Sequence, residues 1–90
     1  MADEPPSLVS DAQPRYPVAA AEDGIEADVT LMLTVTAEGR VRDAKLVRPA
    51  GADFDRAALA AAKQLRFRAA RVDGLAVASR VRWICQFRLN

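Results

Sequence analysis

The 90-residue chain contains no histidine, one cysteine and three serines. A serine or cysteine hydrolase needs a base beside its nucleophile, and an ordinary zinc site needs several Cys or His ligands. The single thiol, Cys85, has no partner for a disulfide within the chain, so cysteine usage does not indicate a redox compartment. We therefore expect no catalytic, cofactor-binding or metal-binding residues and no enzymatic activity.

Long apolar runs are also missing. No stretch approaches the ~20 residues that are needed to cross a bilayer, and the acidic start Met1-Ala2-Asp3-Glu4 does not resemble a secretory signal. Hydrophobic residues make up 51% of the chain and charged residues 28%, which is typical of a folded protein. We expect one small soluble domain with a modest core, taken from a longer protein.

The near-neutral total charge hides an asymmetry between the two halves of the chain. Residues 1–39 carry eight acidic residues and one base, Arg15, whereas residues 40–90 carry twelve bases and four acidic residues. Two interpretations stay open: the halves neutralise each other in the fold, or the second half presents a basic face to an acidic partner.

Two strands and a tight turn are predicted in the first half. Residues 27–36 alternate strictly, with Val29, Leu31, Leu33 and Val35 on one face, which is typical of a half-buried strand. Residues 41–48 form the second strand of an antiparallel hairpin, and Gly39 supplies the positive φ of its turn. Because Val41 is out of phase with Ala44 and Leu46, we expect a bulge near Arg42-Asp43.

Two helices and a third strand complete the pattern. A short helix follows Pro17 and ends at Gly24, and a longer one covers residues 54–67 with Asp53 as its N-cap. Asp73-Gly74 predicts a turn, and residues 79–89 alternate throughout, with Val81, Trp83, Cys85, Phe87 and Leu89 on the core face. The order α-β-β-α-β predicts an α+β fold, a three-stranded antiparallel sheet with two helices packed on one face. The final strand is expected at an edge of this sheet, because the first two strands already form a hairpin.

The segment before the first helix has its own character. Residues 1–12 are expected to be a flexible linker and residues 13–90 the folded domain. In "QPRYP" (residues 13–17), both Gln13 and Tyr16 precede a proline, which favours a stiff, extended backbone. The tyrosine is therefore expected to lie on an extended lead-in beside the folded body.

Taken together, these motifs resemble the TonB C-terminal domain family over residues 13–89. The resemblance depends on Tyr16-Pro17, Gly24-Ile25-Glu26, Gly39-Arg40-Val41, Phe54-Asp55, Arg66-Phe67-Arg68, Asp73-Gly74 and Phe87-Arg88-Leu89, in this order and spacing. Ala27 and Ala69 depart from the family, which usually has glycine and proline at these positions. These two departures affect local turns and leave the fold assignment unchanged.

The resemblance implies a function. The family is the periplasmic end of an energy transducer that is anchored in the inner membrane and works with ExbB and ExbD. Its C-terminal domain binds the TonB box, an extended segment of an outer-membrane transport receptor, and transmits proton-motive force to it for nutrient uptake. The receptor segment joins the last strand and contacts the lead-in. On this chain those positions are Gln13, Pro14, Arg15, Tyr16, Arg80, Arg82, Ile84, Gln86 and Arg88.

Physical arguments support strand addition and leave alternatives open. An edge strand offers unpaired backbone groups to an extended peptide, and Arg80, Arg82 and Arg88 would protect it from self-association and attract acidic receptor segments. The alternatives are a TonB-like domain fused to the N-terminus of an outer-membrane receptor, a homodimer paired through the long edge, and a nucleic-acid-binding module. Aromatic residues are only 6% of the chain and the arginines alternate along a strand, so we expect no nucleic acid partner.

Overall fold

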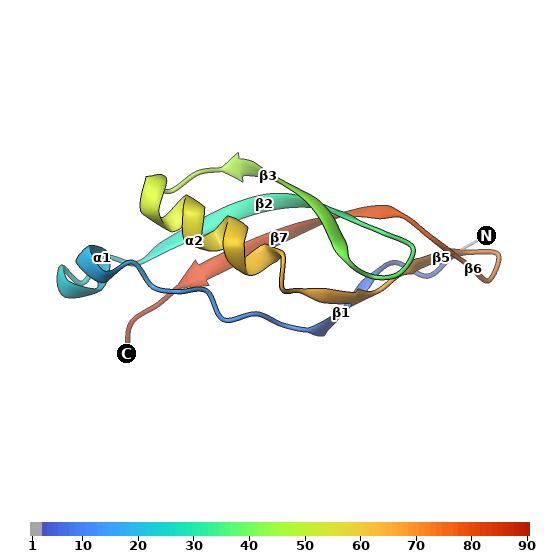
Figure 1. The fold of residues 1–90 in the computed structure, drawn as a ribbon, viewed down its shortest axis with the longest axis horizontal. Helices are drawn as coiled ribbons and strands as arrows, with labels where there is room; N and C mark the ends of the chain where they lie inside the picture. The colour runs from blue at the N-terminus through green and yellow to red at the C-terminus, as the bar shows by residue number, and fades with distance from the viewer. Residues whose placement is uncertain (1–2) are drawn as a thin grey trace.

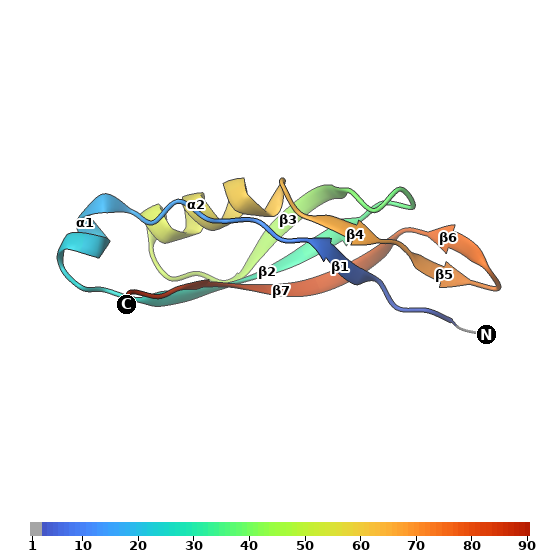
Figure 2. The same cartoon turned by 90° about the horizontal axis from the view of Figure 1, so that it is seen from below.

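A three-stranded antiparallel sheet forms the centre of the structure, a computed structural model that describes residues 3–90. Its strands lie in the order β3-β2-β7, with β2 spanning Ala27–Val35, β3 Val41–Arg48 and β7 Ser79–Phe87 (Figure 1). The α+β class, the three-stranded antiparallel sheet and the edge position of the last strand are therefore confirmed. Helices α1 (Val18–Glu22) and α2 (Ala52–Ala62) lie on one side of this sheet (Figure 2).

Two short sheets extend the molecule away from α1. Strand β1 (Ser7–Ser10) pairs with β4 (Arg66–Arg68), and β5 (Ala70–Val72) pairs with β6 (Leu75–Val77) across the predicted Asp73-Gly74 turn. Both turn residues have positive φ, 53° and 82°. The result is an elongated body of 50 × 21 × 17 Å. Neither helix in residues 3–90 has the length and apolar character that crossing a membrane requires.

The core lies between the sheet and α2. The predicted inward residues of β2, Val29, Leu31, Leu33 and Val35, are all completely buried. They pack against Phe54, Ala58 and Ala62 of α2, where the alanines let the helix approach the sheet closely. The strict alternation of β2 therefore identified its core face correctly.

The β2–β3 hairpin contains the predicted bulge. Thr34 pairs with Asp43 and Val35 with Val41, so Arg42 is the extra residue. A second irregularity lies at the other end of β3, where Thr30 pairs with Arg48 and Leu31 with Leu46, leaving Val47 as the extra residue. The two bulges bend β3 at both ends.

Two expectations about the long helix are wrong. Gly51 occupies the N-cap position instead of Asp53, which lies in the first turn and forms an exposed ion pair with Arg56. The carboxylate of Asp55 instead accepts a hydrogen bond from the backbone N–H of Ala50, at 2.8 Å. The helix also ends at Ala62 and not at Phe67, because residues 66–68 pair with β1 as a strand.

A short strand lies within the segment that the sequence predicts to be a linker. Ser7–Ser10 forms β1, although all four of its residues are exposed, and Glu4 makes a further bridge to Arg71. Their pairing partners lie some sixty residues later, so no local pattern indicates them. The domain boundary expected at residue 13 stays a prediction.

Cys85 lies on the core face of β7, as its position in the alternation predicts, and is 2% exposed. Burial raises the pKa of its thiol to about 11, and the carboxylates of Asp11 and Asp28 act in the same direction. Between the unfolded and the folded pKa, the Cys85 thiol stays protonated in the folded protein but loses its proton in the unfolded chain. Stability should therefore fall as pH rises from about 9 to 11.

We expect Cys85→Val to remove this part of the alkaline loss of stability. Urea unfolding of both proteins is measured at pH 8 and at pH 10.5. Between these two pH values, the free energy of unfolding should fall more for the wild type than for the variant. Equal losses in the two proteins would show that the pKa of the Cys85 thiol is not higher in the folded state than in the unfolded state.

Candidate binding site at the edge of the sheet

The outer edge of β7, the side facing away from β2, is not paired with any other strand of residues 3–90. On its inner side β7 pairs with β2 over nine consecutive residues, from Ser79↔Val35 to Phe87↔Ala27, without a register shift. A long regular edge of this kind presents a row of backbone N–H and C=O groups to an incoming strand. This edge is the candidate site.

The other edge of the sheet is less suitable. Strand β3 is interrupted by the bulges at Arg42 and Val47, and it carries the charged residues Asp43, Lys45 and Arg48. Bulges and charges are the usual devices that prevent an edge from accepting a further strand. Strand β7 also carries charged residues, Arg80 and Arg82, but it has no bulge, so its regular backbone is the feature that singles it out.

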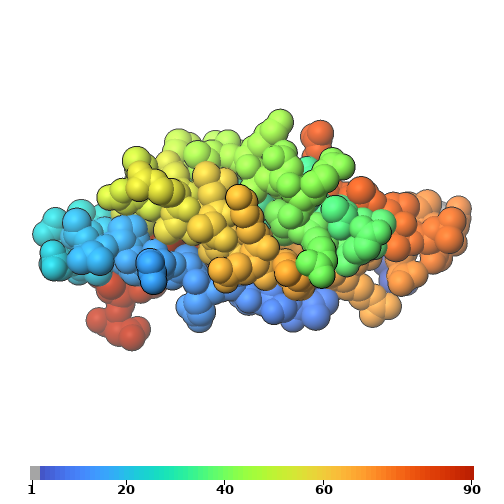
Figure 3. Space-filling view, viewed as in Figure 1, coloured from blue at the N-terminus to red at the C-terminus, as the bar shows by residue number. Residues whose placement is uncertain are grey.

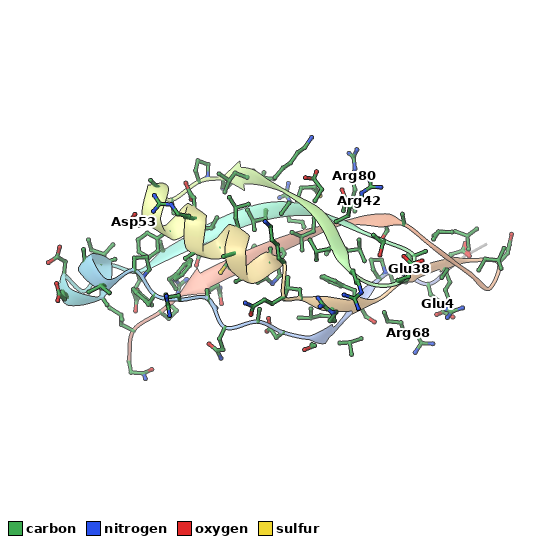
Figure 4. All side chains as sticks on the ribbon, viewed as in Figure 1. Glu4, Glu38, Arg42, Asp53, Arg68 and Arg80 are labelled. Atoms are coloured by element: carbon green, nitrogen blue, oxygen red, sulfur yellow. The ribbon has the colours of Figure 1, made fainter. Side chains whose placement is uncertain are left out.

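The predicted residues of β7 lie together on one face of the sheet. Arg80, Arg82, Ile84 and Gln86 are all exposed, and Ile84 is 50% exposed. They lie on the face opposite α2, since their neighbours Val81, Trp83, Cys85 and Phe87 point towards the core. Figure 4 labels Arg80, which projects outward at the end of the sheet where β7 begins.

The lead-in, residues 11–17, flanks the outer edge from the other face. In Figure 1 this segment runs along the side of β7 that faces away from β2, and Figure 2 shows it at the level of α2 and above the plane of the sheet. On the face seen in Figure 3, atoms of α2, of the β2–β3 hairpin and of β4 lie in front of much of β7, and the blue atoms of the lead-in lie beside it. A strand added to β7 would therefore have the lead-in on one face and the arginines on the other.

Tyr16 fixes the lead-in to the body. Its ring makes edge contacts with Phe54 (ring centroids 6.0 Å apart) and Phe87 (5.6 Å), and its hydroxyl donates a 2.5 Å hydrogen bond to the Ile25 carbonyl. Desolvation raises the pKa of the Tyr16 hydroxyl, with the Glu26 carboxylate acting in the same direction and Arg88 against it. The side chain thus packs as an anchor, while Gln13 and Arg15 stay exposed and Pro14 is half-buried.

Arg88 differs from the other arginines of this strand. Its guanidinium contacts the Asp28 carboxylate at 2.7 Å and donates to the carbonyls of Ala27 and Phe87. The next N–H, that of Leu89, donates to Glu26 at 2.8 Å. These contacts tie the end of β7 to the start of β2, so Arg88 has a structural task of its own.

Two residues that belong to the site were assigned only to the core. Val81 and Trp83 point towards α2 but are half-buried, whereas Cys85 and Phe87 are 2% and 1% exposed. The first two are less covered because α2 and the lead-in shield the end of β7 at Phe87 more fully. The alternating pattern predicts on which side of the sheet a side chain lies. It does not predict how much of that side chain is buried by neighbouring elements.

A separate groove of about 750 Å³ lies between the lead-in and α2, lined by Gln13, Arg15, Ala57, Ala60 and Gln64 among others. Residues of the lead-in therefore border this groove as well as the outer edge of β7. Among residues 3–90, no three side chains of the usual metal-binding types lie close together.

Comparison with known proteins agrees with this architecture. Residues 12–89 match the family described as "Gram-negative bacterial TonB protein C-terminal". The chain belongs to the TonB C-terminal domain family. Among curated proteins it is 38% identical over 78 residues to Protein TonB of Xanthomonas campestris pv. campestris, and 33% identical over 91 residues to Protein TonB of Vibrio cholerae. These alignments cover 86% and 100% of this chain.

The same relatives are much longer than this chain, which spans 35% and 37% of their lengths. A solved structure is also similar: the solution NMR structure of the Pseudomonas aeruginosa TonB C-terminal domain. It has a TM-score of 0.73 and 29% sequence identity, and the alignment covers 93% of this chain and 86% of that one. The fold expected from the family resemblance is therefore confirmed.

Proposed function

We propose that this chain is the receptor-binding domain of a TonB-type energy transducer. It binds the TonB box of outer-membrane transport receptors by adding that extended segment to the outer edge of β7. The full-length protein is anchored in the inner membrane, works with ExbB and ExbD, and reaches the receptor across the periplasm. The observation that carries this proposal is the nine-residue regular edge of β7, in a chain of the TonB C-terminal domain family.

The mechanism is backbone pairing with limited demands on sequence. An added strand gains N–H···O=C bonds along β7, and alternate side chains contact the lead-in and the arginine face. Such pairing suits a domain that serves several receptors, because main-chain groups are the same in every partner. No enzymatic step is involved. Neither the receptor-fusion nor the nucleic-acid alternative gains support, since the curated relatives that the chain matches are named Protein TonB.

The test is a titration of the ¹⁵N-labelled chain with a synthetic TonB-box peptide. We expect the amide signals of Ser79–Phe87 to shift, while those of β3, Val41–Arg48, stay in place because its edge is bulged. Unchanged β7 signals at millimolar peptide would overturn the proposal.

A chemical control separates strand pairing from side-chain contact. Two versions of the peptide carry N-methyl groups on alternate residues, in the two opposite phases. Only one phase removes the N–H groups that point at β7, so one version should lose binding and the other should keep much of it. Equal binding of both versions would exclude a β-ladder as the mode of contact.

A further inference from the structure

We propose that β7 selects a receptor segment in which acidic side chains stand two residues apart, both on the face of Arg80 and Arg82. This inference rests on the proposed strand addition and specifies which segments are bound best. It depends on the register of the sheet, on which arginines are available, and on the charge at the opposite face.

The register defines four cross-strand rows on the face opposite α2. Arg80 lies beside Thr34, Arg82 beside Met32, Ile84 beside Thr30, and Gln86 beside Asp28. The β2 neighbours of Arg80 and Arg82 are uncharged, so these two guanidinium groups have no acidic residue directly beside them on the inner side. An added strand would place its own side chains on the outer side of the same rows, where opposite charges in directly facing positions are stabilising.

The arginines of this face are not equivalent. Arg88 is already paired with Asp28, whereas Arg80 and Arg82 form no ion pair with any residue of 3–90. Asp43, on β3, faces the same side but lies across Thr34 from Arg80, two strands away. The unneutralised positive charge is therefore concentrated at two positions spaced two residues apart along β7.

The opposite face of an added strand meets different surroundings. Half-buried Val81 and Trp83 border it, and the carboxylate of Asp11 in the lead-in is near enough to raise the pKa of the Cys85 thiol. An acidic side chain there would be partly desolvated beside Trp83 and repelled by Asp11. We therefore expect the best-bound segment to carry acidic side chains on the face towards the arginines and apolar side chains on the face towards Trp83.

Two eight-residue peptides of identical composition test the inference. One, Thr-Asp-Val-Asp-Val-Ile-Val-Thr, has its acidic residues two apart; the other, Thr-Asp-Asp-Val-Val-Ile-Val-Thr, has them adjacent. A strand presents residues two apart on the same face, so the second peptide cannot place both carboxylates beside the arginines in any register. Binding is followed by the amide shifts of β7 and by the fluorescence of Trp83, the single tryptophan of the chain.

We expect the first peptide to bind at least about 1.4- to 5-fold more tightly at low salt, because it forms one more favourable cross-strand pair and places no carboxylate on the Trp83 face. The gap should shrink at high salt, because exposed charges are screened. Arg82→Glu should reverse or abolish the preference. Arg48→Glu, an equal charge change at an exposed residue of β3 on the opposite edge of the sheet, should leave it intact.

The outcomes separate this inference from the proposed function. If both peptides shift the β7 signals with equal affinity, strand addition stands and the charge selection is overturned. A preference that survives Arg82→Glu would also overturn it. If neither peptide nor a TonB-box peptide moves the β7 signals, the proposed function fails, and the selection fails with it.

Discussion

Replacing Gly39 with alanine is expected to lower the free energy of unfolding by about 2–5 kcal/mol. Gly39 has φ +85°, and an added Cβ would lie 1.9 Å from the carbonyl oxygen of Phe67. The Gly39 carbonyl also accepts the Phe67 N–H at 2.8 Å, so the hairpin turn and β4 are in direct backbone contact. In the variant, alanine is strained by the left-handed backbone conformation, and its methyl group must also displace β4.

Gly24→Ala is the matched control, because Gly24 also has positive φ (+69°) but no atom lies within 4 Å of the added Cβ. It should cost only about 1–2 kcal/mol, the backbone term alone. Thermal unfolding should show this as a fall in Tm several degrees larger for Gly39→Ala than for Gly24→Ala. Equal falls would mean that β4 accommodates the methyl group and that the close approach has no stabilising role.

The sequence identified the parts of the fold that depend on local alternation. The core faces of β2 and β7, the hairpin and the bulge at Arg42 all follow from period-two patterns and one out-of-phase valine. The end of α2 did not follow, because Lys63-Gln64-Leu65 carries no proline or glycine that would stop a helix. Arg66–Arg68 is a strand because β1 pairs with it from a distant part of the chain.

The candidate site was foreseen to a similar extent. The edge position of β7 and the outward set from Arg80 to Gln86 follow from hairpin order and alternation. The engagement of Arg88 by Asp28 and the half-open environment of Trp83 depend on how residues sixty or more positions apart come together. Whether the nine predicted contact residues bind a receptor stays a prediction.

Replacing Phe87 with alanine should lower the free energy of unfolding by about 3–5 kcal/mol. Phe87 is 1% exposed, and its ring lies 4.9 Å from that of Phe54 and 5.6 Å from that of Tyr16 (centroid distances). The substitution leaves a cavity and removes two edge-on ring contacts. It also removes a main support of Tyr16, and the lead-in should then become mobile beside β7.

Ile84→Ala is the control on the same strand: Ile84 is 50% exposed and should cost less than about 1 kcal/mol. Urea unfolding followed by circular dichroism measures both losses, and amide exchange of residues 13–19 reports the lead-in. Urea is added to the Ile84→Ala sample until both variants have the same free energy of unfolding. If Phe87→Ala still speeds the exchange far more than Ile84→Ala, the aromatic cluster is what holds the lead-in beside the edge. Similar exchange in both variants would show that the lead-in is held by its other contacts, and that the site does not depend on the core for its shape.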